Sequence, residues 1–202
     1  MSSGSHRLTA TAPKPRVLGY IVLALVTVAL AVAAWVLAFR AQPDSYPVAC
    51  GLPAAGEPVA STMIAGEQPT RPAEVPIRVL NANGSTGEAT AIAEILASAG
   101  FSLAPDNPYG NDELVPDQNL PCFGQLRFSP QHNASAVALH AVFPCFELVH
   151  DARQDPSVDI ALGMGFDKLE SNGLLNDTIA ALNNQADPNA ANLESLGSSS
   201  CT

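Results

Sequence analysis

The feature that most constrains this chain is an uninterrupted apolar run near its N-terminus. Val17 to Phe39 reads VLGYIVLALVTVALAVAAWVLAF, without a single charged side chain. As a helix rising about 1.5 Å per residue, the run would reach about 35 Å, whereas the hydrocarbon core of a bilayer is about 30 Å thick. Tyr20 and Trp35 lie near its two ends, where amphipathic rings favour the membrane interface. The run therefore predicts one transmembrane helix over residues 17–39.

The flanks of the run decide between a retained anchor and a cleaved signal peptide. A signal peptide has an apolar region of only about 7–15 residues, and no clear small-x-small cleavage site precedes Arg40. Arg7, Lys14 and Arg16 precede the run with no acidic residue among them. The positive-inside rule then predicts a single-pass cell membrane protein, with residues 1–16 as a cytoplasmic tail and the remainder extracytoplasmic.

The predicted outer part is strongly acidic. It holds all 19 Asp and Glu residues against six Lys and Arg, a net charge of −13. A surface that neutralises nucleic-acid phosphates needs the opposite sign, so nucleic acid is excluded as the main partner. A wall polymer bound here should be neutral, or be held by local groups such as Arg78 and Arg127. We expect these two arginines on separate strands, facing solvent, so a shared arginine site is only a hypothesis.

Composition divides the outer part into three segments. Residues 40–74 are rich in proline, which predicts a semi-extended linker without a core of its own. Residues 75–184 alternate strand and helix patterns and predict the folded extracytoplasmic domain. Residues 185–202 predict a flexible tail.

The periodicity of the domain predicts its fold class. Strands are expected at 77–80, 101–104, 124–128, 146–149 and 158–163, with one helix after the first strand and another after the third. The order β-α-β-β-α-β-β is that of an α+β, ferredoxin-like sandwich built from split βαβ units. A further C-terminal helix is predicted from the spacing of Leu174, Leu175, Ile179 and Leu182.

The turn after the first strand has the outline of a phosphate-binding loop without its chemistry. Its sequence, NANGSTGE, has neither the GxxxxGK of a Walker loop nor the GxGxxG of a dinucleotide site. A negative charge at Glu88 would repel an anion from the helix N-terminus. We therefore interpret Asn81 and Gly84 as turn residues, and Ser85 with Glu88 as a helix-capping box. Gly100 has the position of a left-handed residue that ends the helix.

The sequence offers no constellation for catalysis, a cofactor or a metal ion. His132, His140 and His150 lack metal-ligand spacing and are interpreted as ordinary surface or core histidines. The chain also has no GxSxG nucleophile elbow. We therefore predict that it is not an enzyme.

The four cysteines, Cys50, Cys122, Cys145 and Cys201, all lie in the predicted outer part. None belongs to a CxxC pair, and an even number in an oxidising compartment predicts two disulfides. Sequence alone leaves three pairings open. The predicted topology favours Cys122–Cys145, because the third and fourth strands would start at the same end of the sheet. That hypothesis leaves Cys50 with Cys201.

Several motifs together resemble the LytR C-terminal domain family. The run IRVLNANGSTGEATAIAEILASAGF has its strand, its VLN-type turn and its helix with an aaGF ending. A second run, from LRFSPQ to GMGFDKL, has its Pro-initiated helix and its Asp-aliphatic-x-Leu-Gly-x-x-Phe ending. The resemblance covers residues 75–169. Asn81 matches the asparagine of the family's turn, and no ligand residue transfers with the resemblance.

The whole arrangement, one anchor, a short linker and a lone domain of this family, resembles actinobacterial envelope integrity proteins of mycobacteria and corynebacteria. In many actinobacterial proteins the domain follows a LytR-CpsA-Psr phosphotransferase domain, for which the roughly 35 residues before Val75 are too few. The resemblance implies a non-enzymatic role in cell envelope integrity. We expect a binding or scaffolding module for cell-wall polymer or envelope-assembly membrane proteins. The alternative is an accessory subunit that docks on another membrane complex through its transmembrane helix, where Ala29–Ala34 permit close packing.

Overall fold

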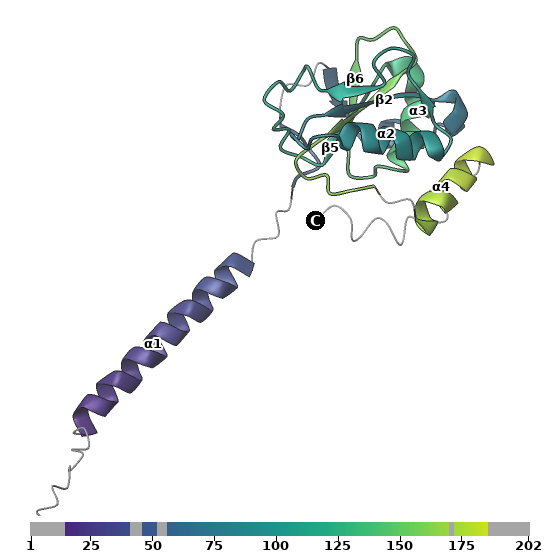
Figure 1. The fold of residues 1–202 in the computed structure, drawn as a ribbon. Helices are drawn as coiled ribbons and strands as arrows, with labels where there is room; N and C mark the ends of the chain where they lie inside the picture. The colour runs from purple at the N-terminus through teal and green to yellow at the C-terminus, as the bar shows by residue number, and fades with distance from the viewer. Residues whose placement is uncertain (1–14, 41–45, 52–55, 170–171, 186–202) are drawn as a thin grey trace, which may run out of the picture. The chain divides into compact units, whose positions relative to one another are not determined.

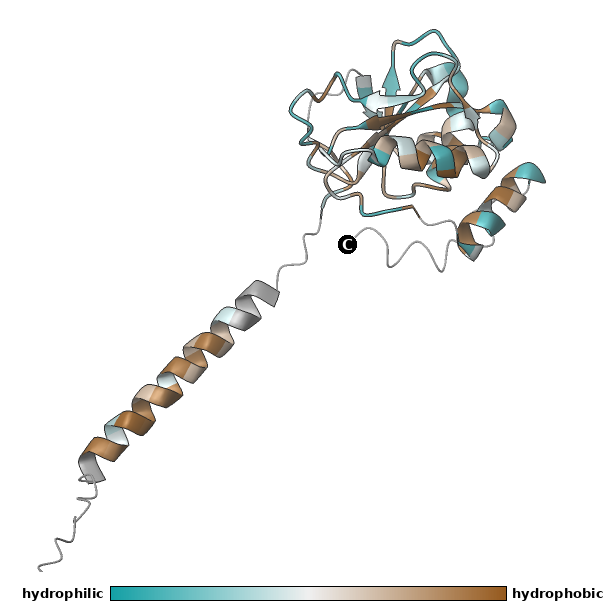
Figure 2. Cartoon of the chain, viewed as in Figure 1, coloured by the Kyte–Doolittle hydropathy of each residue, from teal (hydrophilic) through white to brown (hydrophobic). Residues whose placement is uncertain are grey.

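The computed structural model describes residues 15–40, 46–51, 56–169 and 172–185 (Figure 1). The chain divides into two units, residues 1–43 and 44–202. The first unit contains one helix, α1 (Pro15–Arg40), which is apolar along most of its length (Figure 2). Its segment Val17–Trp35 has a mean hydropathy of 2.6 and no buried residue, so the predicted helix is confirmed as long and apolar enough to cross a membrane.

The second unit is built on one mixed sheet of seven strands. The strands are β1 (Gly56–Val59), β2 (Pro76–Asn81), β3 (Ser102–Leu103), β4 (Tyr109–Asn111), β5 (Gly124–Phe128), β6 (Glu147–Asp151) and β7 (Val158–Leu162). Their order is β1-β6-β5-β7-β2-β3, and β4 also pairs with β2. β1 is antiparallel to β6 and β5 to β7, while the remaining pairs are parallel.

The α+β class is confirmed, but the ferredoxin-like strand order is wrong. In split βαβ units, another strand separates the two strands that a helix joins. Here β2 pairs directly with β3, and β5 pairs directly with β6. β7 lies between these two βαβ units, parallel to β2 and antiparallel to β5. All five of its residues are buried, as a strand in the middle of a sheet requires when both faces are covered.

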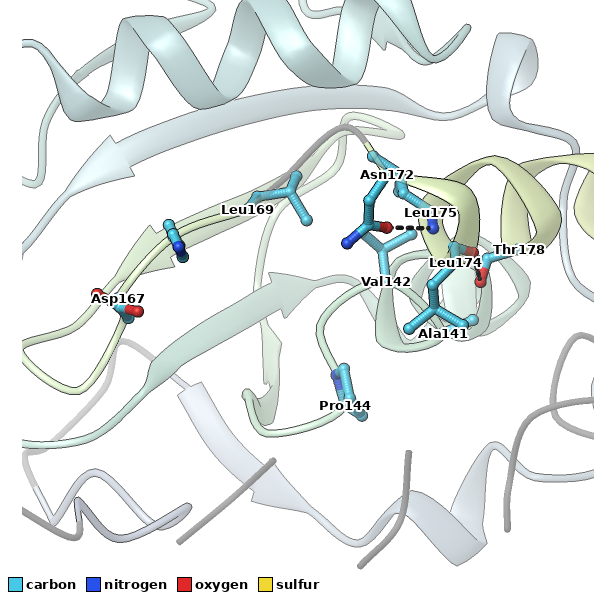
Figure 3. Close-up of a pocket in the computed structure, with 10 residues that line it drawn as sticks. Ala141, Val142, Pro144, Asp167, Leu169, Asn172, Leu174, Leu175 and Thr178 are labelled. Carbon is cyan, nitrogen blue, oxygen red and sulfur yellow. Dashed lines mark hydrogen bonds between the residues drawn. The ribbon is translucent and has the colours of Figure 1, made fainter. Parts of the chain in front are cut away.

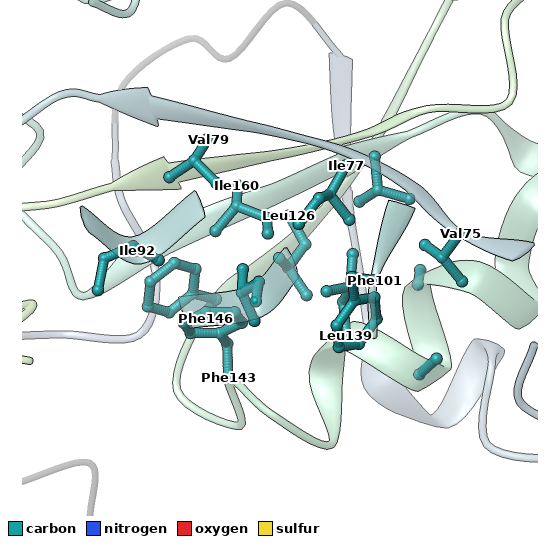
Figure 4. Packing of buried hydrophobic residues seen from close by; sticks show 14 of the residues in the cluster. Val75, Ile77, Val79, Ile92, Phe101, Leu126, Leu139, Phe143, Phe146 and Ile160 are labelled. Atoms are coloured by element: carbon teal, nitrogen blue, oxygen red, sulfur yellow. The ribbon is translucent and has the colours of Figure 1, made fainter. Parts of the chain in front are cut away.

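The helices lie together on one face of the sheet. They are α2 (Glu88–Ser98), α3 (Asn133–His140) and α4 (Gly173–Asn183). Their apolar stripes meet alternate residues of the strands, because side chains of a strand point to opposite faces with a period of two. Figure 4 shows this core, in which Ile77, Val79, Leu126 and Ile160 of the strands pack with Ile92 and Leu139 of the helices.

Two of the predicted helices form as the periodicity requires. α2 ends in a left-handed Gly100 (φ 106°), and the N–H groups of Gly100 and Phe101 donate to the carbonyls of Ala97 and Leu96. This is the Schellman arrangement, which satisfies the last carbonyls of a helix. α4 is the predicted C-terminal helix, and its apolar side chains reach the core through Leu175, Ile179 and Leu182.

The segment predicted to be a linker contributes to the folded unit. Within residues 56–74, β1 completes one edge of the sheet, and two short 3₁₀ turns follow, η1 (Ser61–Met63) and η2 (Pro72–Glu74). Ile64, only 2% exposed, joins the core. Pro58 is tolerated because an edge strand leaves one side of its backbone without a sheet partner. The linker prediction is therefore wrong for these residues, whereas 41–45 and the predicted tail beyond Gln185 lie outside the described residues.

Candidate functional site

The sheet face opposite the helices carries charged side chains and is here called the charged face. Arg78 of β2, Asp159 of β7 and Arg127 of β5 occupy directly opposite positions on three neighbouring strands. The alternation of each strand sends Ile77, Val79, Leu126 and Ile160 to the core and these three side chains to the other side. The apolar alternation of the strands therefore places the charges together.

Arg127 makes a buried ion pair at the centre of this face. Its Nη1 and Nη2 donate to the two carboxylate oxygens of Asp112 at 3.0 and 2.7 Å, and both side chains are only 1% exposed. Its Nε donates to Gln125 at 2.9 Å, and Gln125 in turn donates to Glu147 at 2.7 Å. Such a bidentate pair is stable in the interior only when its charge is compensated by well-placed hydrogen bonds, and here each of the three guanidinium nitrogens has a partner. It ties the loop that carries Asp112 to the sheet.

A second network runs along the same face from Arg78. Its Nη1 donates to Oδ1 of Asp159 at 3.2 Å, and Oδ2 of Asp159 accepts from Arg153 at 2.8 Å. Burial alone would lower the pKa of Arg153, but hydrogen bonds and charge from Asp151 and Asp159 outweigh it and raise the pKa. At the edge of this network the Ser157 hydroxyl donates to Asp155 and lowers the pKa of that carboxyl group.

A cleft of about 650 Å³ opens between the charged face and the loop after β3. Its wall combines donors and acceptors from Arg78, Asp106, Asn111 and Asp159 with an apolar patch at Leu80. Nε of Arg78 is buried and has no hydrogen-bond partner among the described residues. Unsatisfied buried donors are costly, and a small turn of the partly exposed Arg78 side chain would present this N–H to an acceptor from a ligand in the cleft. The carboxylates around it disfavour an anion, which leaves a neutral polar ligand as the best chemical fit.

The structure brings the two sequence-predicted arginines to one cleft, since Arg78 and Arg127 both line it. The expectation that both face solvent is wrong for Arg127, which is buried, while the Arg78 side chain is 28% exposed. The alternation of side chains along the strands explains why Arg78 and Arg127 share one face of the sheet. The contact between Arg127 and Asp112 could not be predicted in the same way, because Asp112 belongs to a long loop whose position over the sheet has no local sequence signal.

The turn residues predicted after the first strand lie together at the end of β2. The Asn81 side chain accepts from the N–H groups of Asn83 and Gly84 and donates to the carbonyl of Ser85 at 2.7 Å. Gly84 is left-handed, with φ 79°. The turn thus has its own side-chain hydrogen bonds.

The predicted capping box between Ser85 and Glu88 does not form. α2 begins two residues later than that box requires, with the left-handed Gly87 as its N-cap and no side-chain cap bond. The carboxylate of Glu88 instead accepts from Nδ2 of Asn83 at 2.7 Å. A glycine at the cap lets the chain turn directly from the loop into the helix, and Ser85 is left outside it.

The three histidines interpreted from the sequence as ordinary residues lie in separate hydrogen-bond environments. Nδ1 of His132 lies 2.9 Å from Oγ of Ser129, and Nε2 of His150 lies 3.0 Å from Oδ1 of Asn133. Burial lowers the pKa of His140, partly offset by a backbone hydrogen bond with Pro144. Within the described residues no group of three His, Cys, Asp or Glu side chains is placed to hold a metal ion.

The preferred disulfide Cys122–Cys145 is wrong, because Cys122 is bonded to Cys50. β5 and β6 are parallel neighbours, as the pairing hypothesis required. However, Cys122 points to the opposite side of the sheet from the helices, where Cys50 packs with Ala82 and Leu120. The Cys50–Cys201 alternative falls with it, and Cys201 lies outside the described residues.

A smaller cavity of about 280 Å³ lies beside α4 and has both polar and apolar lining residues. Figure 3 shows Val142, which follows α3 in the chain, close to Asn172 and Leu175 at the start of α4. The side-chain oxygen of Asn172 accepts from the N–H of Leu175 and caps that helix. Two of the polar side chains that line this cavity are thus committed to α4 itself, since the Thr178 hydroxyl also donates to the carbonyl of Leu174. We therefore take the larger cleft as the candidate site.

Comparison with known proteins identifies the relatives of the chain. The family model described as LytR cell envelope-related transcriptional attenuator matches residues 74–166. The cell envelope integrity protein Cei of Mycobacterium tuberculosis is 34% identical over 180 residues, 84% of this chain and 80% of that protein. A solved structure, the soluble domain of a conserved hypothetical secreted protein from Mycobacterium marinum, is 37% identical with a TM-score of 0.57. It covers 63% of this chain and 84% of that one.

Proposed function

We propose that this protein supports the integrity of the cell envelope as a membrane-anchored, non-enzymatic module. The chain belongs to the LytR C-terminal domain family, together with the cell envelope integrity protein Cei. α1 is its anchor, and residues 44–202 form the extracytoplasmic part that binds or scaffolds. The observation that carries the proposal is the 34% identity to Cei over 84% of the chain, since this match extends well beyond residues 74–166.

The proposed orientation in the membrane follows from charge and cysteine chemistry. The basic residues before α1 favour a cytoplasmic N-terminus. The Cys50–Cys122 disulfide is expected to persist only outside the reducing cytoplasm. A relative of the folded unit is described as secreted. These three observations support the same orientation.

The cleft on the charged face is the proposed binding site. A neutral segment of a wall polymer, or a polar side chain of an assembly protein, would accept from the unpartnered Nε of Arg78. Two features keep the cleft selective. The ion pairs hold the arginines in place, and the acidic surface of the domain disfavours anionic polymers.

Crosslinking mass spectrometry of the full-length protein in its native membrane tests the proposal. Crosslinks from residues 44–202 to wall-synthesis or glycopolymer-ligating proteins are the expected result. Crosslinks confined to α1 and an unrelated complex would overturn it in favour of the accessory-subunit alternative. Transferase activity from the purified folded unit would overturn the non-enzymatic role.

Arg78→Ala tests the cleft separately from the rest of the proposal. It removes the free Nε donor while Asp159 keeps its hydrogen bond from Arg153, so the fold is expected to persist. Arg71→Ala is the matched control, because Arg71 is 49% exposed in its side chain and lies outside the cleft. We expect Arg78→Ala, and not the control, to weaken retention on purified cell wall at least fivefold. Equal retention of both variants would exclude the cleft as the site.

A further inference from the structure

An uncharged surface lies on the folded unit next to the point where the chain arrives from α1. It is formed by Tyr46–Gly51 and Gly163–Phe166 and is called the uncharged rim below. We propose that the uncharged rim rests on the lipid surface in which α1 is anchored. The inference needs α1 to span a membrane, as the proposed function does, but it needs neither an envelope role nor a ligand in the cleft.

The two segments of the rim are fastened to each other. The N–H of Gly165 donates to the carbonyl of Cys122 at 2.9 Å, and Cys122 is bonded to Cys50. A Cβ added at Gly165 would lie 2.4 Å from Cβ of Tyr46, so the Tyr46 side chain packs directly on the Gly165 backbone. The rim is therefore a fixed surface of the folded unit.

The rim exposes apolar side chains in an otherwise acidic domain. Val48 is 43% and Met164 45% exposed, and neither segment contains a charged residue. Single exposed apolar residues are ordinary on protein surfaces. Here two of them share one uncharged surface on a unit that has five Lys and Arg against 19 Asp and Glu, a net charge of −14. The rim itself therefore carries no charge that lipid headgroups would repel.

The covalent chain supplies the argument for lipid as the occupant. Only residues 41–45 separate Arg40, the last residue of α1, from Tyr46. Six residues span at most about 22 Å even when fully extended. The rim is thus held within reach of the headgroup region whatever conformation those residues adopt. Tyrosine is a residue type that favours this interface, and exposed apolar side chains are stabilised when they are buried at the headgroup boundary.

The methionines of the chain provide the test, since there are only three, Met1, Met63 and Met164. The full-length protein carries ¹³C-methyl methionine in phosphatidylcholine nanodiscs, with or without nitroxide-labelled headgroups. Met164 is the reporter on the rim. Met63 is the control, because it is 72% exposed on η1, whose residues line a different cavity beside α3. We expect the nitroxide to broaden the Met164 methyl resonance at least threefold more than that of Met63.

A pair of substitutions separates lipid contact from simple proximity. Val48→Asp places a charge on the rim and should cut the broadening of Met164 by at least half. Leu114→Asp adds the same charge at a similarly exposed position, 52% exposed on the wall of the cleft, and should leave it unchanged. A far-ultraviolet circular dichroism spectrum and a urea midpoint like those of the unchanged protein confirm that each variant is folded. Equal broadening of Met164 and Met63, or no response to Val48→Asp, would overturn the inference while leaving the crosslinking test of the envelope role unaffected.

Discussion

Replacing Asp112 by alanine should destabilise the folded unit more than any change to an exposed charge. The substitution leaves Arg127 buried with Nη1 and Nη2 unpaired, and only its Nε keeps a partner in Gln125. Removing one member of a buried ion pair costs about 3–5 kcal/mol, because the remaining charge is left without compensation. A domain of this size has a total stability of about 5–15 kcal/mol, so the loss is a large fraction of it.

The exposed Arg71–Glu74 pair gives the matched control. Its charged atoms are 3.6 Å apart, and both side chains are about half exposed or more, at 49% and 60%. Such pairs contribute about 0–1 kcal/mol, because water screens them and two long side chains must be ordered. Glu74→Ala should therefore change stability little, although it removes the same negative charge.

Urea unfolding followed by far-ultraviolet circular dichroism measures the difference. With a slope of about 1–3 kcal/mol per molar urea, a loss of about 4 kcal/mol moves the midpoint down by about 1.3–4 M. The double variant Asp112→Leu with Arg127→Met should recover most of the loss, because a hydrophobic replacement leaves no buried charge. A cost below about 1 kcal/mol for Asp112→Ala would refute the reasoning, since it would mean that water reaches Arg127.

Three further predictions concern other parts of the unit. Because the pKa of His140 is lowered in the folded state, the unfolded chain binds a proton at this histidine at a higher pH than the folded chain does. The free energy of unfolding should therefore fall as the pH drops below about 6.5. His140→Gln should flatten that dependence in unfolding measurements between about pH 5 and 7. Gly163→Ala should cost about 1–3 kcal/mol by thermal denaturation, because its Cβ would lie 2.2 Å from a backbone oxygen, whereas Gly66→Ala has open space and should cost little. Non-reducing peptide mapping should join Cys145, which is in a disulfide, to Cys201, because the other two cysteines are bonded to each other; a peptide joining Cys145 to either of those would contradict the structure.

The elements predicted well are those whose signal is local. α1 follows from one apolar run, and α2 and α4 follow from apolar stripes with a period of 3.6 residues. The end of α2 was predictable because a single glycine has the backbone freedom that the cap requires. Each of these depends on residues that are close together in the chain, and so no knowledge of the tertiary fold was needed.

The elements predicted badly depend on competition between distant segments. β7 is a run of five residues that are apolar except for Asp159. The pattern identifies it as a strand without saying between which neighbours it lies. β1, with the sequence GEPV, has no strand signal, and it forms because β6 offers an unpaired edge. The disulfide was mispredicted for the same reason. Once β1 and the preceding residues pack on the unit, Cys50 reaches Cys122 from a segment that composition assigns to a linker.

The charges at the candidate site limit which ligands can bind there. Three of the five basic residues of the folded unit, Arg78, Arg127 and Arg153, lie on the charged face, and each is paired with an aspartate. Neither that face nor the acidic remainder of the surface therefore offers a net attraction for an anion. Recognition in the cleft has to rely on short-range hydrogen bonds, above all from Nε of Arg78. Since such bonds are only weakly screened by salt, ligand binding at the cleft should be nearly independent of ionic strength, in contrast to polymer binding through bulk charge.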